Sequence, residues 1–496
     1  MGLHAEHSHE ADVQAYPAVD AAWEFLDKHR NARFDSADIK ALRQKIDWHI
    51  VPLMFCCYTM QFLDKVILNY AAVMGLPKDL HLQGNEFSNV ATFLFVALLC
   101  FEVPNTYCLQ VFPAARWLGA NVMLWGIATA CGAAAHNYQT LLISRVFLGI
   151  FEATIGPSLL LISSQWYTKS EQAPRFSLWG CGTGIGQIVG GAVSYGFQQV
   201  KPGAALASWR IMFVVLGCIT VVIGLCTFMF LPDTPMQARW MTDDEKVMHL
   251  KHVSINQTGI RDHKFRLSEI SEALVDPQVY LLVLAVILLS ISSGVVTTYS
   301  STLIRNLGYS GPRAALMNMP SGVVSIFFTI FVGYGIRKQS HRWAWIIACI
   351  IPAIIGSALM SFLPINNRSG VLAGIYLVNA VIAPLFIFYN LTAANIAGAT
   401  KRTFCAAVVS GSFSIGNIIG PQTFQARDAP EYRPAKYAVL GTQAGCAFVT
   451  FTLFLYYFAM NRKRKVIEAS VEEQYMDREV WERLTDKENP RFRYVY

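Results

Sequence analysis

Residues 48–76 read WHIVPLMFCCYTMQFLDKVILNYAAVMGL, and this stretch decides the fold class. A helix of about 20 apolar residues crosses the roughly 30 Å of hydrocarbon in a bilayer. Two opposite charges, Asp64 and Lys65, lie within the stretch. A charge at this depth costs several kcal/mol on insertion scales, so it is kept where it faces a protein interior or a water-filled path. The pair therefore predicts a membrane helix with one face turned away from lipid.

The composition of the whole chain agrees with a membrane protein. Hydrophobic residues make up 54% of the 496 residues and charged residues 15%, whereas a soluble globular chain has about a quarter of its residues charged. We attribute the net charge of +7 to membrane topology and to contact with anionic lipid. We expect no nucleic-acid partner, because the sequence offers no compact basic domain that carries aromatic residues.

Twelve stretches are long and apolar enough to span a bilayer, and the polar segment 232–277 divides them six and six. We therefore predict an all-α membrane protein of twelve transmembrane helices in two six-helix bundles. The predicted spans are 48–74, 87–109, 117–135, 139–166, 176–198, 208–231, 278–303, 314–336, 343–364, 371–395, 404–426 and 437–460.

The segments outside the spans complete the predicted organisation. The predicted parts are a cytoplasmic N-terminal tail with an amphipathic helix along the membrane surface (1–47, the helix at 37–46), an N-terminal bundle (48–231), a cytoplasmic linker (232–277), a C-terminal bundle (278–460) and a solvated cytoplasmic C-terminal tail (461–496). The first 47 residues contain no apolar core followed by a small-residue cleavage site, so we expect the first span to direct insertion.

The distribution of Lys and Arg predicts the orientation in the membrane. The short inner and outer loops hold equal numbers of these residues, so the tails decide the orientation. Arg43 and Lys45 precede the first span, and four consecutive basic residues, 462–465, follow the last. We therefore expect both termini in the cytoplasm, with the protein in the plasma membrane.

The sequence lacks the signatures of an enzyme or a metal protein. All eleven cysteines fall within the predicted spans or at their edges, so a disulfide framework is not expected. The chain contains no His-Glu-x-x-His motif, no Gly-x-Ser-x-Gly motif and no cluster with metal-ligand spacing. We predict no catalytic residues, no cofactor and no metal. Asn367-Arg-Ser is a glycosylation sequon in a predicted outer loop.

The fifth predicted span is rich in glycine, but its spacing does not fit a dinucleotide-binding loop, and no strand precedes it. Gly182, Gly186 and Gly190 instead recur every four residues, which places them on one helix face where another backbone can approach closely. Gly416 and Gly420 do the same in the eleventh span. We expect both faces to be packing surfaces.

The fourth predicted span carries two further charges. Arg145 and Glu152 are seven residues apart, which puts them on nearly the same helix face about 10 Å apart along the axis. A structural ion pair near the membrane edge is the competing explanation, but four charges in the same bundle, with Asp64 and Lys65, favour function. Glu102 in the second span is also at membrane depth, and the sequence leaves structural pairing and function equally open for it.

Polar side chains in the spans could accompany these charges, although most buried polar groups only satisfy contacts between helices. We select Tyr58, Gln61, Tyr299 and Asn390 as candidate substrate-binding residues. Further polar side chains at membrane depth are Asn69, Asn417 and Gln422.

The four charges suggest ion-coupled transport. A carboxyl group in a dehydrated cavity can hold a proton near neutral pH, and a nearby cation opposes this. We expect Lys65 and Arg145 to bind a substrate carboxylate while Asp64 and Glu152 exchange protons. The two bundles would rock around a central site between them.

The pattern Arg145-x3-Gly149-x2-Glu152-Ala in the fourth span, with two six-span halves, resembles the major facilitator superfamily. Within it, the chain is similar to the fungal allantoate permease group of the anion:cation symporter family. The segments that carry the closer resemblance are 62–65, 69–71, 231–235, 238–240, 244–246, 398–402, 417–421, 428–432 and 485–496. The resemblance implies the twelve-helix fold, and it implicates Asp64, Lys65, Arg145 and Glu152 in the handling of protons and anions.

Our leading hypothesis is import of a small organic anion with protons, by a monomer in the bilayer. The resemblance implies substrates such as allantoate, nicotinate, pantothenate or related carboxylates. The chain departs from the superfamily pattern in the loop at 111–116, which lacks the usual Gly-x3-Asp-Arg sequence. Efflux of a fungal secondary metabolite is the main competing function. The fifth span lacks the Gly-Pro pairing of drug/proton antiporters, which favours symport. A nutrient-sensing receptor is a more distant alternative, because the tails are short.

Overall fold

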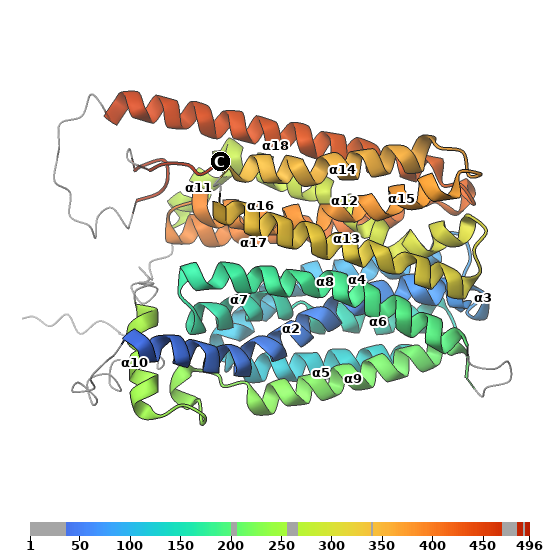
Figure 1. Cartoon of the computed structure of the whole chain (residues 1–496), viewed down its shortest axis with the longest axis horizontal. Helices are drawn as coiled ribbons and strands as arrows, with labels where there is room; N and C mark the ends of the chain where they lie inside the picture. Colours follow the sequence, from blue (N-terminus) through green and yellow to red (C-terminus); the bar gives the residue numbers. More distant parts are fainter. Residues whose placement is uncertain (1–35, 200–205, 255–265, 339–340, 469–483, 490–491) are drawn as a thin grey trace, which may run out of the picture.

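The computed structural model describes residues 36–199, 206–254, 266–338, 341–468, 484–489 and 492–496. The regular structure in these residues is helical, and the long helices lie side by side along one direction (Figure 1). Ten spans among them are long and apolar enough to cross a membrane. Two further helices, α5 (Ala114–Gly132) and α8 (Lys169–Gln198), lie alongside these spans and correspond to the third and fifth predicted spans (Figure 1). The all-α prediction is confirmed.

The helices of the two halves of the sequence lie on two sides of the molecule (Figure 1). The N-terminal half contains α2 (Ser36–Met74), α3 (Leu76–Asp79), α4 (Glu86–Val111), α5, α6 (Tyr138–Glu152), α7 (Ile155–Trp166), α8 and α9 (Ser208–Phe230), followed by η1 (Pro235–Gln237) and α10 (Asp243–Ser254). The C-terminal half contains α11 (Leu267–Val275), α12 (Pro277–Asn306), α13 (Gly311–Lys338), α14 (Arg342–Phe362), α15 (Arg368–Val378), η2 (Asn379–Val381), α16 (Ile382–Asn395), α17 (Ala399–Gln422), η3 (Ala426–Asp428) and α18 (Arg433–Glu468).

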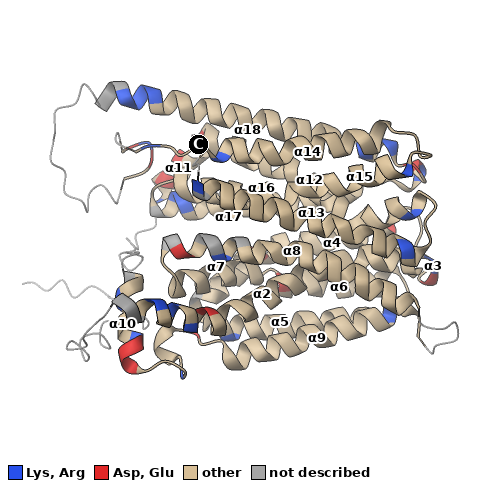
Figure 2. Ribbon diagram, in the orientation of Figure 1, with Lys and Arg blue, Asp and Glu red and all other residues tan. Residues whose placement is uncertain are grey.

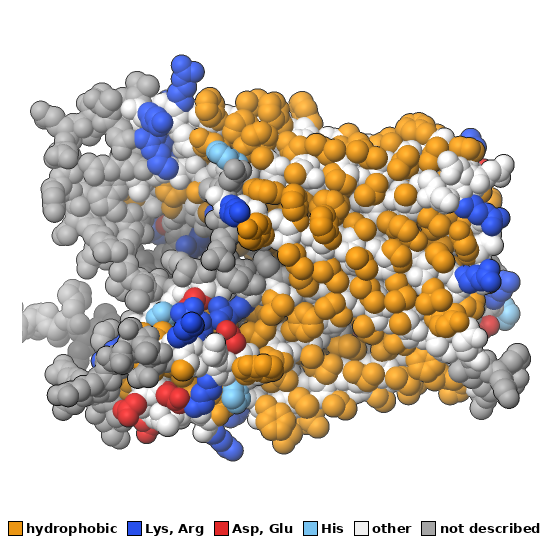
Figure 3. Space-filling view, viewed as in Figure 1, with side chains coloured by type: hydrophobic (Ala, Val, Ile, Leu, Met, Phe, Trp, Pro, Cys, Tyr) orange, Lys and Arg blue, Asp and Glu red, His pale blue; other side chains and the backbone are white. Residues whose placement is uncertain are grey.

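Charged residues gather at the two ends of the helices (Figure 2), and the side of the molecule between the ends is apolar (Figure 3). We call the end where α10 and α11 lie the linker end, and the opposite end the α3 end (Figure 1). An apolar girdle between two charged ends suits a bilayer, where exposed hydrophobic side chains face lipid.

Helix α2 differs from its prediction. The surface helix expected at 37–46 and the first span form one continuous helix of 39 residues, so that the span extends past the membrane at the linker end. Ion pairs hold this extension against its neighbours: Asp47 pairs with Arg175 of α8 at 2.6 Å, and Lys45 pairs with Glu245 of α10 at 2.8 Å. Leu42 in the extension is buried. The extension therefore packs against protein.

Two predicted spans are interrupted. The fourth consists of α6 and α7, with a break at residues 153–154, and the tenth consists of α15 and α16, joined by η2. A proline follows each break, with Pro157 four residues after the start of the first and Pro384 five residues after the start of the second. Proline lacks the N–H that would bond to the carbonyl four residues earlier, which weakens the helix there. The first break directly follows Glu152.

The glycine face of α8 packs as predicted. A Cβ atom added at Gly182, Gly186 or Gly190 would meet Thr59, Leu63 or Tyr70 of α2. The other face of the same helix packs against α13 of the C-terminal half: a Cβ atom at Gly184 would lie 2.4 Å from the carbonyl oxygen of Gly322. Gly416 and Gly420 likewise allow α17 to approach α12, since their added Cβ atoms would meet Ser290 and the Ile291 carbonyl oxygen.

The end of the chain packs more closely on the protein than the solvated, partly ordered tail that the sequence predicts at 461–496. Asp486 is fully buried, and it binds the buried Lys401 of α17 at 2.6 Å. Lys401 also contacts Glu272 at 2.8 Å and Asp276 at 2.9 Å. The Tyr494 hydroxyl donates to Asp486 at 2.7 Å. Residues 484–489 and 492–496 therefore dock on the C-terminal half, because Lys401 compensates the charge of Asp486 that burial would otherwise make costly.

Candidate functional site

Helices α2 and α6 bring two of the predicted charges into contact. The ammonium group of Lys65 lies 3.0 Å from Oε1 of Glu152. Glu152 is fully buried at the last residue of α6, whereas the Lys65 side chain is 11% exposed. The carboxylate oxygens of Glu152 have no well-directed hydrogen bond in the described structure. Its negative charge therefore depends on Lys65, with the Gln61 amide beside it.

Asp64 points to a different partner from its neighbour in sequence, because consecutive helix residues are about 100° apart around the axis. Its carboxylate accepts hydrogen bonds from the Thr129 hydroxyl at 2.7 Å and from the indole N–H of Trp125, both on α5. Asp64 is 4% exposed. A buried carboxylate with two donors is well satisfied inside the N-terminal half.

Arg145 completes the set of charges. It is 2% exposed, and its guanidinium carbon lies 5.0 Å from the centre of the Phe213 ring. It interacts through its charge with Asp64 and Glu152. Its Nη2 atom has no hydrogen-bond partner among the described atoms. We call Asp64, Lys65, Arg145 and Glu152 the four-charge cluster.

The cluster is formally neutral and has one unsatisfied donor. Two acids and two bases, held by α2 and α6, cancel one another in a site that water hardly reaches. A buried N–H without an acceptor costs about 1–3 kcal/mol, and more for a charged group. An incoming anion would therefore find a donor that the protein itself leaves unpaired.

Lys65 also faces the C-terminal half. Its ammonium nitrogen lies 5.9 Å from the centre of the Phe95 ring on α4 and 5.6 Å from that of Phe413 on α17. Aromatic faces attract cations. Lys65 is thus the member of the cluster that lies nearest the interface between the halves.

Glu102 lies at this interface as well. Its carboxylate accepts a hydrogen bond from the Ser410 hydroxyl of α17, and the charge of Lys65 attracts it. Tyr389 of α16 lies close to both Glu102 and Tyr58. Glu102 therefore belongs to a polar contact between the halves, a placement that the sequence alone left open.

Two candidate residues do not join the cluster. Tyr299 lies at the α3 end, where its hydroxyl shares a hydrogen bond with Ser88 at 2.5 Å and its ring stacks on Phe424 at 4.2 Å between centroids. Asn390 is exposed and takes part in none of the described hydrogen bonds. Neither makes a described contact with the four-charge cluster, and their predicted role in substrate binding stays a prediction.

The halves are joined at the α3 end. Asn69 of α2 donates to the Ser300 hydroxyl of α12 at 2.8 Å, and Gln422 of α17 donates to Thr92 of α4 at 2.8 Å. At the linker end, by contrast, every ion pair among the described residues stays within one half. The described contacts thus close the molecule at the α3 end.

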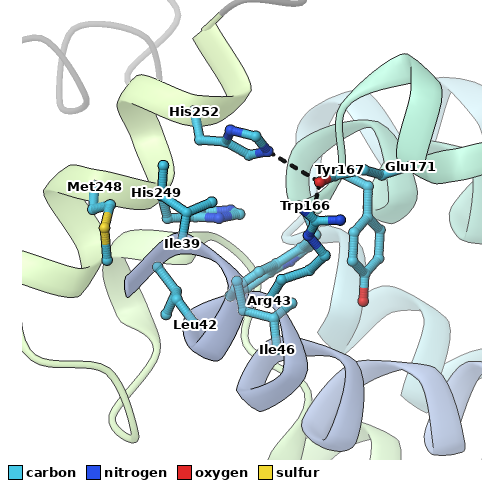
Figure 4. Close-up of a pocket in the computed structure, with 10 residues that line it drawn as sticks. All are labelled: Ile39, Leu42, Arg43, Ile46, Trp166, Tyr167, Glu171, Met248, His249 and His252. Atoms are coloured by element: carbon cyan, nitrogen blue, oxygen red, sulfur yellow. Dashed lines mark hydrogen bonds and ion pairs between the residues drawn. The ribbon is translucent and has the colours of Figure 1, made fainter. Parts of the chain in front are cut away.

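A small cavity at the linker end separates α10 from α2 and α7 (Figure 4). Its volume of about 10 Å³ suits a single water molecule. Glu171 accepts a hydrogen bond from His252 at 3.1 Å and pairs with Arg43 at 2.9 Å. His249 lies against the Trp166 ring, and burial lowers its pKa to about 4. This cavity is too small for a substrate and serves the packing of α10.

The sequence did not predict some of the residues that lie around the cluster. Trp125 and Thr129 are four residues apart on α5, and this spacing could have marked them as one polar helix face. Tyr389 and Ser410 carry no such signal, because they come near Glu102 only through the packing of the two halves. No group of three or more His, Cys, Asp or Glu residues in the described ranges could hold a metal.

Comparison with known proteins places this arrangement in a family. Residues 54–421 match the Major Facilitator Superfamily. The chain belongs to this superfamily. It is 37% identical over 463 residues to the thiamine pathway transporter THI73 of Saccharomyces cerevisiae, which covers 92% of this chain and 86% of that protein. It is 31% identical over 493 residues to the allantoate permease of the same yeast, covering 96% and 90%.

Solved structures agree on the fold. The proton:xylose symporter XylE bound to 6-bromo-6-deoxy-D-glucose matches with a TM-score of 0.65 over 84% of this chain and 96% of that one, at 14% identity. Such a low identity carries the fold alone. The predicted superfamily and the relation to the allantoate permease are confirmed, and the chain is a multi-pass membrane transporter and not an enzyme.

Proposed function

We propose that this transporter carries a small organic anion together with a proton, and that it imports its substrate. The formal neutrality of the buried four-charge cluster is the observation that carries the proposal. An anion that enters a neutral site of low dielectric leaves it with one uncompensated negative charge, which is costly. Uptake of one proton by a carboxylate of the cluster removes that cost.

The geometry suggests how the exchange proceeds. A substrate carboxylate competes with Glu152 for the ammonium group of Lys65, while the unpaired Nη2 atom of Arg145 offers a second donor. Glu152, separated from Lys65, then takes up a proton because its carboxylate is buried. Asp64, which Thr129 and Trp125 already satisfy, is the second proton-exchanging acid in this proposal. Gln61 and Tyr58 lie on the same side of α2 as Lys65, by their helical spacing.

The substrate class follows from the charge of the site and from a relative. Lys65 and Arg145 are the two cations of the cluster that can bind an anionic substrate. One relative is named for allantoate, which is a carboxylate. We propose that the linker end and both termini are cytoplasmic, since basic residues flank the first and last spans there. The two halves would then exchange access to the cluster by rocking against each other.

The test is an uptake screen in cells that express the protein. Labelled allantoate, nicotinate and pantothenate are offered at pH 5 and pH 7.5, with and without a protonophore, and thiamine is added because another relative is named for its pathway. We expect accumulation of one carboxylate that is faster at pH 5 and abolished by the protonophore. Proton-driven uptake into inside-out vesicles, which corresponds to export from the cell, or accumulation without pH dependence would contradict the proposal.

Variants separate the four charges. Glu152→Gln should abolish proton-driven accumulation, and Lys65→Met should weaken substrate binding. Glu431→Gln is the matched control, because Glu431 lies in an exposed pair with Arg433 at the α3 end. Full proton-driven accumulation by Glu152→Gln would rule out Glu152 as a coupling residue.

A further inference from the structure

We infer that Glu102 is the entry group through which protons reach the four-charge cluster from the linker end. The inference rests on the proposed proton coupling and adds a residue to it. Water hardly reaches the two acids of the four-charge cluster, because Glu152 is fully buried and Asp64 is 4% exposed. A carboxyl group sealed from water exchanges protons only through a neighbouring group that water can reach.

Glu102 is such a group, because it is partly exposed and lies where contact between α4 and α17 ends. From the α3 end, the two helices stay together through Ser88 and the Phe424 carbonyl, through Thr92 and Gln422, and through the Glu102–Ser410 hydrogen bond. These contacts follow one face of α4 at helical spacing.

Beyond Glu102 the described side chains at the next turn of the same face of each helix are exposed. Thr106, one turn further along α4, is exposed, and so is Ala406, one turn before Ser410 on α17. The Thr106 hydroxyl donates to the carbonyl oxygen of Glu102 within its own helix. Among the described hydrogen bonds between α4 and α17, the one from Ser410 to Glu102 therefore lies nearest the linker end, and the carboxyl group of Glu102 borders exposed residues of both helices.

The charges around Glu102 connect it to the cluster. Lys65 on α2 attracts its carboxylate, and Lys65 is itself paired with Glu152. The titratable groups that face Glu102 from the other helices are Tyr389 of α16 and, next to it, Tyr58 of α2. Glu102, Lys65 and Glu152 thus form a row of acid, base and acid that leads from the interface into the N-terminal half.

The proposed transfer balances in atoms and charge. A hydronium ion at the linker end donates a proton to the carboxylate of Glu102 and becomes water, and the proton forms an O–H bond on Glu102 beside the hydrogen bond from Ser410. When Glu152 separates from Lys65, at low pH or on displacement by a substrate carboxylate, the O–H bond of Glu102 breaks and an O–H bond forms on Glu152. Lys65 keeps its positive charge throughout, and Glu102 returns to the ionised form that Ser410 stabilises.

The test follows proton arrival directly and needs no substrate. Purified protein in detergent is jumped from pH 8 to pH 5, and the infrared carbonyl band of protonated carboxyl groups is recorded over time. Loss of the band in Glu152→Gln assigns it to Glu152. In Glu102→Gln the Glu152 band should appear at least about tenfold more slowly than in the wild type, whereas in Glu102→Asp, which keeps a carboxyl group, its rate should stay within about threefold of the wild type.

Two further variants keep the test decisive. Ser410→Ala removes the donor to ionised Glu102, so the band of Glu102 itself should appear about one pH unit higher; this variant decides the matter if Glu102→Gln does not fold. Thr106→Val is the matched control and should behave as the wild type. An unchanged Glu152 rate in Glu102→Gln, or an unshifted Glu102 band in Ser410→Ala, overturns the inference. A wild-type protein whose Glu152 never takes up a proton would instead refute the proposed coupling itself.

Discussion

Replacing Lys65 with methionine tests the central ion pair of the site. The substitution removes the cation 3.0 Å from Glu152 and keeps an apolar side chain of similar length. Fully buried Glu152 must then be protonated in the folded protein. Keeping a carboxyl group with an ordinary pKa of about 4.3 protonated at pH 7 costs about 2.7 × 1.36, or about 4 kcal/mol. This value agrees with the loss of stability of about 3–5 kcal/mol that follows when one partner of a buried ion pair is removed.

The cost should depend on pH with a definite sign. Above about pH 4.3 the unfolded variant loses the proton that folded Glu152 keeps, so the folded state binds more protons and stability falls as pH rises. The destabilisation should therefore shrink from about 4 kcal/mol at pH 7 to about 1 kcal/mol at pH 5. Glu152→Gln should cost less than Lys65→Met, because the Lys65 side chain is 11% exposed and the rings of Phe95 and Phe413 face its charge.

The assay is equilibrium unfolding of the purified protein in detergent, followed by tryptophan fluorescence at pH 5 and pH 7. The double variant, Lys65→Met with Glu152→Gln, should recover most of the stability lost by Lys65→Met, because it leaves no uncompensated charge. Additive losses in the double variant, or a loss in Lys65→Met that is the same at both pH values, would refute the reasoning.

Three further outcomes follow from the packing and charges at other places. Gly184→Ala should slow transport at least about tenfold while Gly196→Ala on the same helix has little effect, since an added Cβ atom would lie 2.4 Å from the Gly322 carbonyl oxygen of the opposite half at Gly184 and would meet nothing within 4 Å at Gly196; transport rates at equal surface expression check this. Lys401→Met should destabilise the protein by about 3–5 kcal/mol because it removes the buried cation that three carboxylates share, whereas its exposed neighbour variant Arg402→Met should cost below about 1 kcal/mol in the same unfolding assay. Burial lowers the pKa of His249 to about 4, so the contribution of His249 to the free energy of unfolding is lost as the pH falls from about 6.5 to 4. The tryptophan fluorescence should change over this window in the wild type and stay flat in His249→Leu.

Local sequence predicts much of the architecture. Length and apolarity specify a span regardless of its neighbours, because a bilayer requires each helix to satisfy its own backbone and cover it with apolar side chains. The glycine face of α8 was likewise predictable, since Gly182, Gly186 and Gly190 share one side of any helix. The presence of charges within α2 and α6 pointed to an interior site for the same reason of cost.

The partners of those charges were decided by the tertiary structure. Asp64 and Lys65 are neighbours in sequence, yet one is satisfied by α5 and the other pairs with the end of α6. The sequence could not distinguish a role for Glu102, because its partner Ser410 is 308 residues away. Nor could it place Tyr299 at the α3 end or bury Asp486 against Lys401.

The physical reason lies in the range of the interactions. The bilayer acts on every span separately, and whether a span is stable there depends on its length, its apolarity and the spacing of its residues. A sequence alone therefore determines twelve helices and the presence of interior charges. Which acid meets which base depends on the rotation of each helix and on contacts between distant segments. Only the packed fold therefore decides that Lys65 pairs with Glu152, and that Glu102 lies where the two halves part.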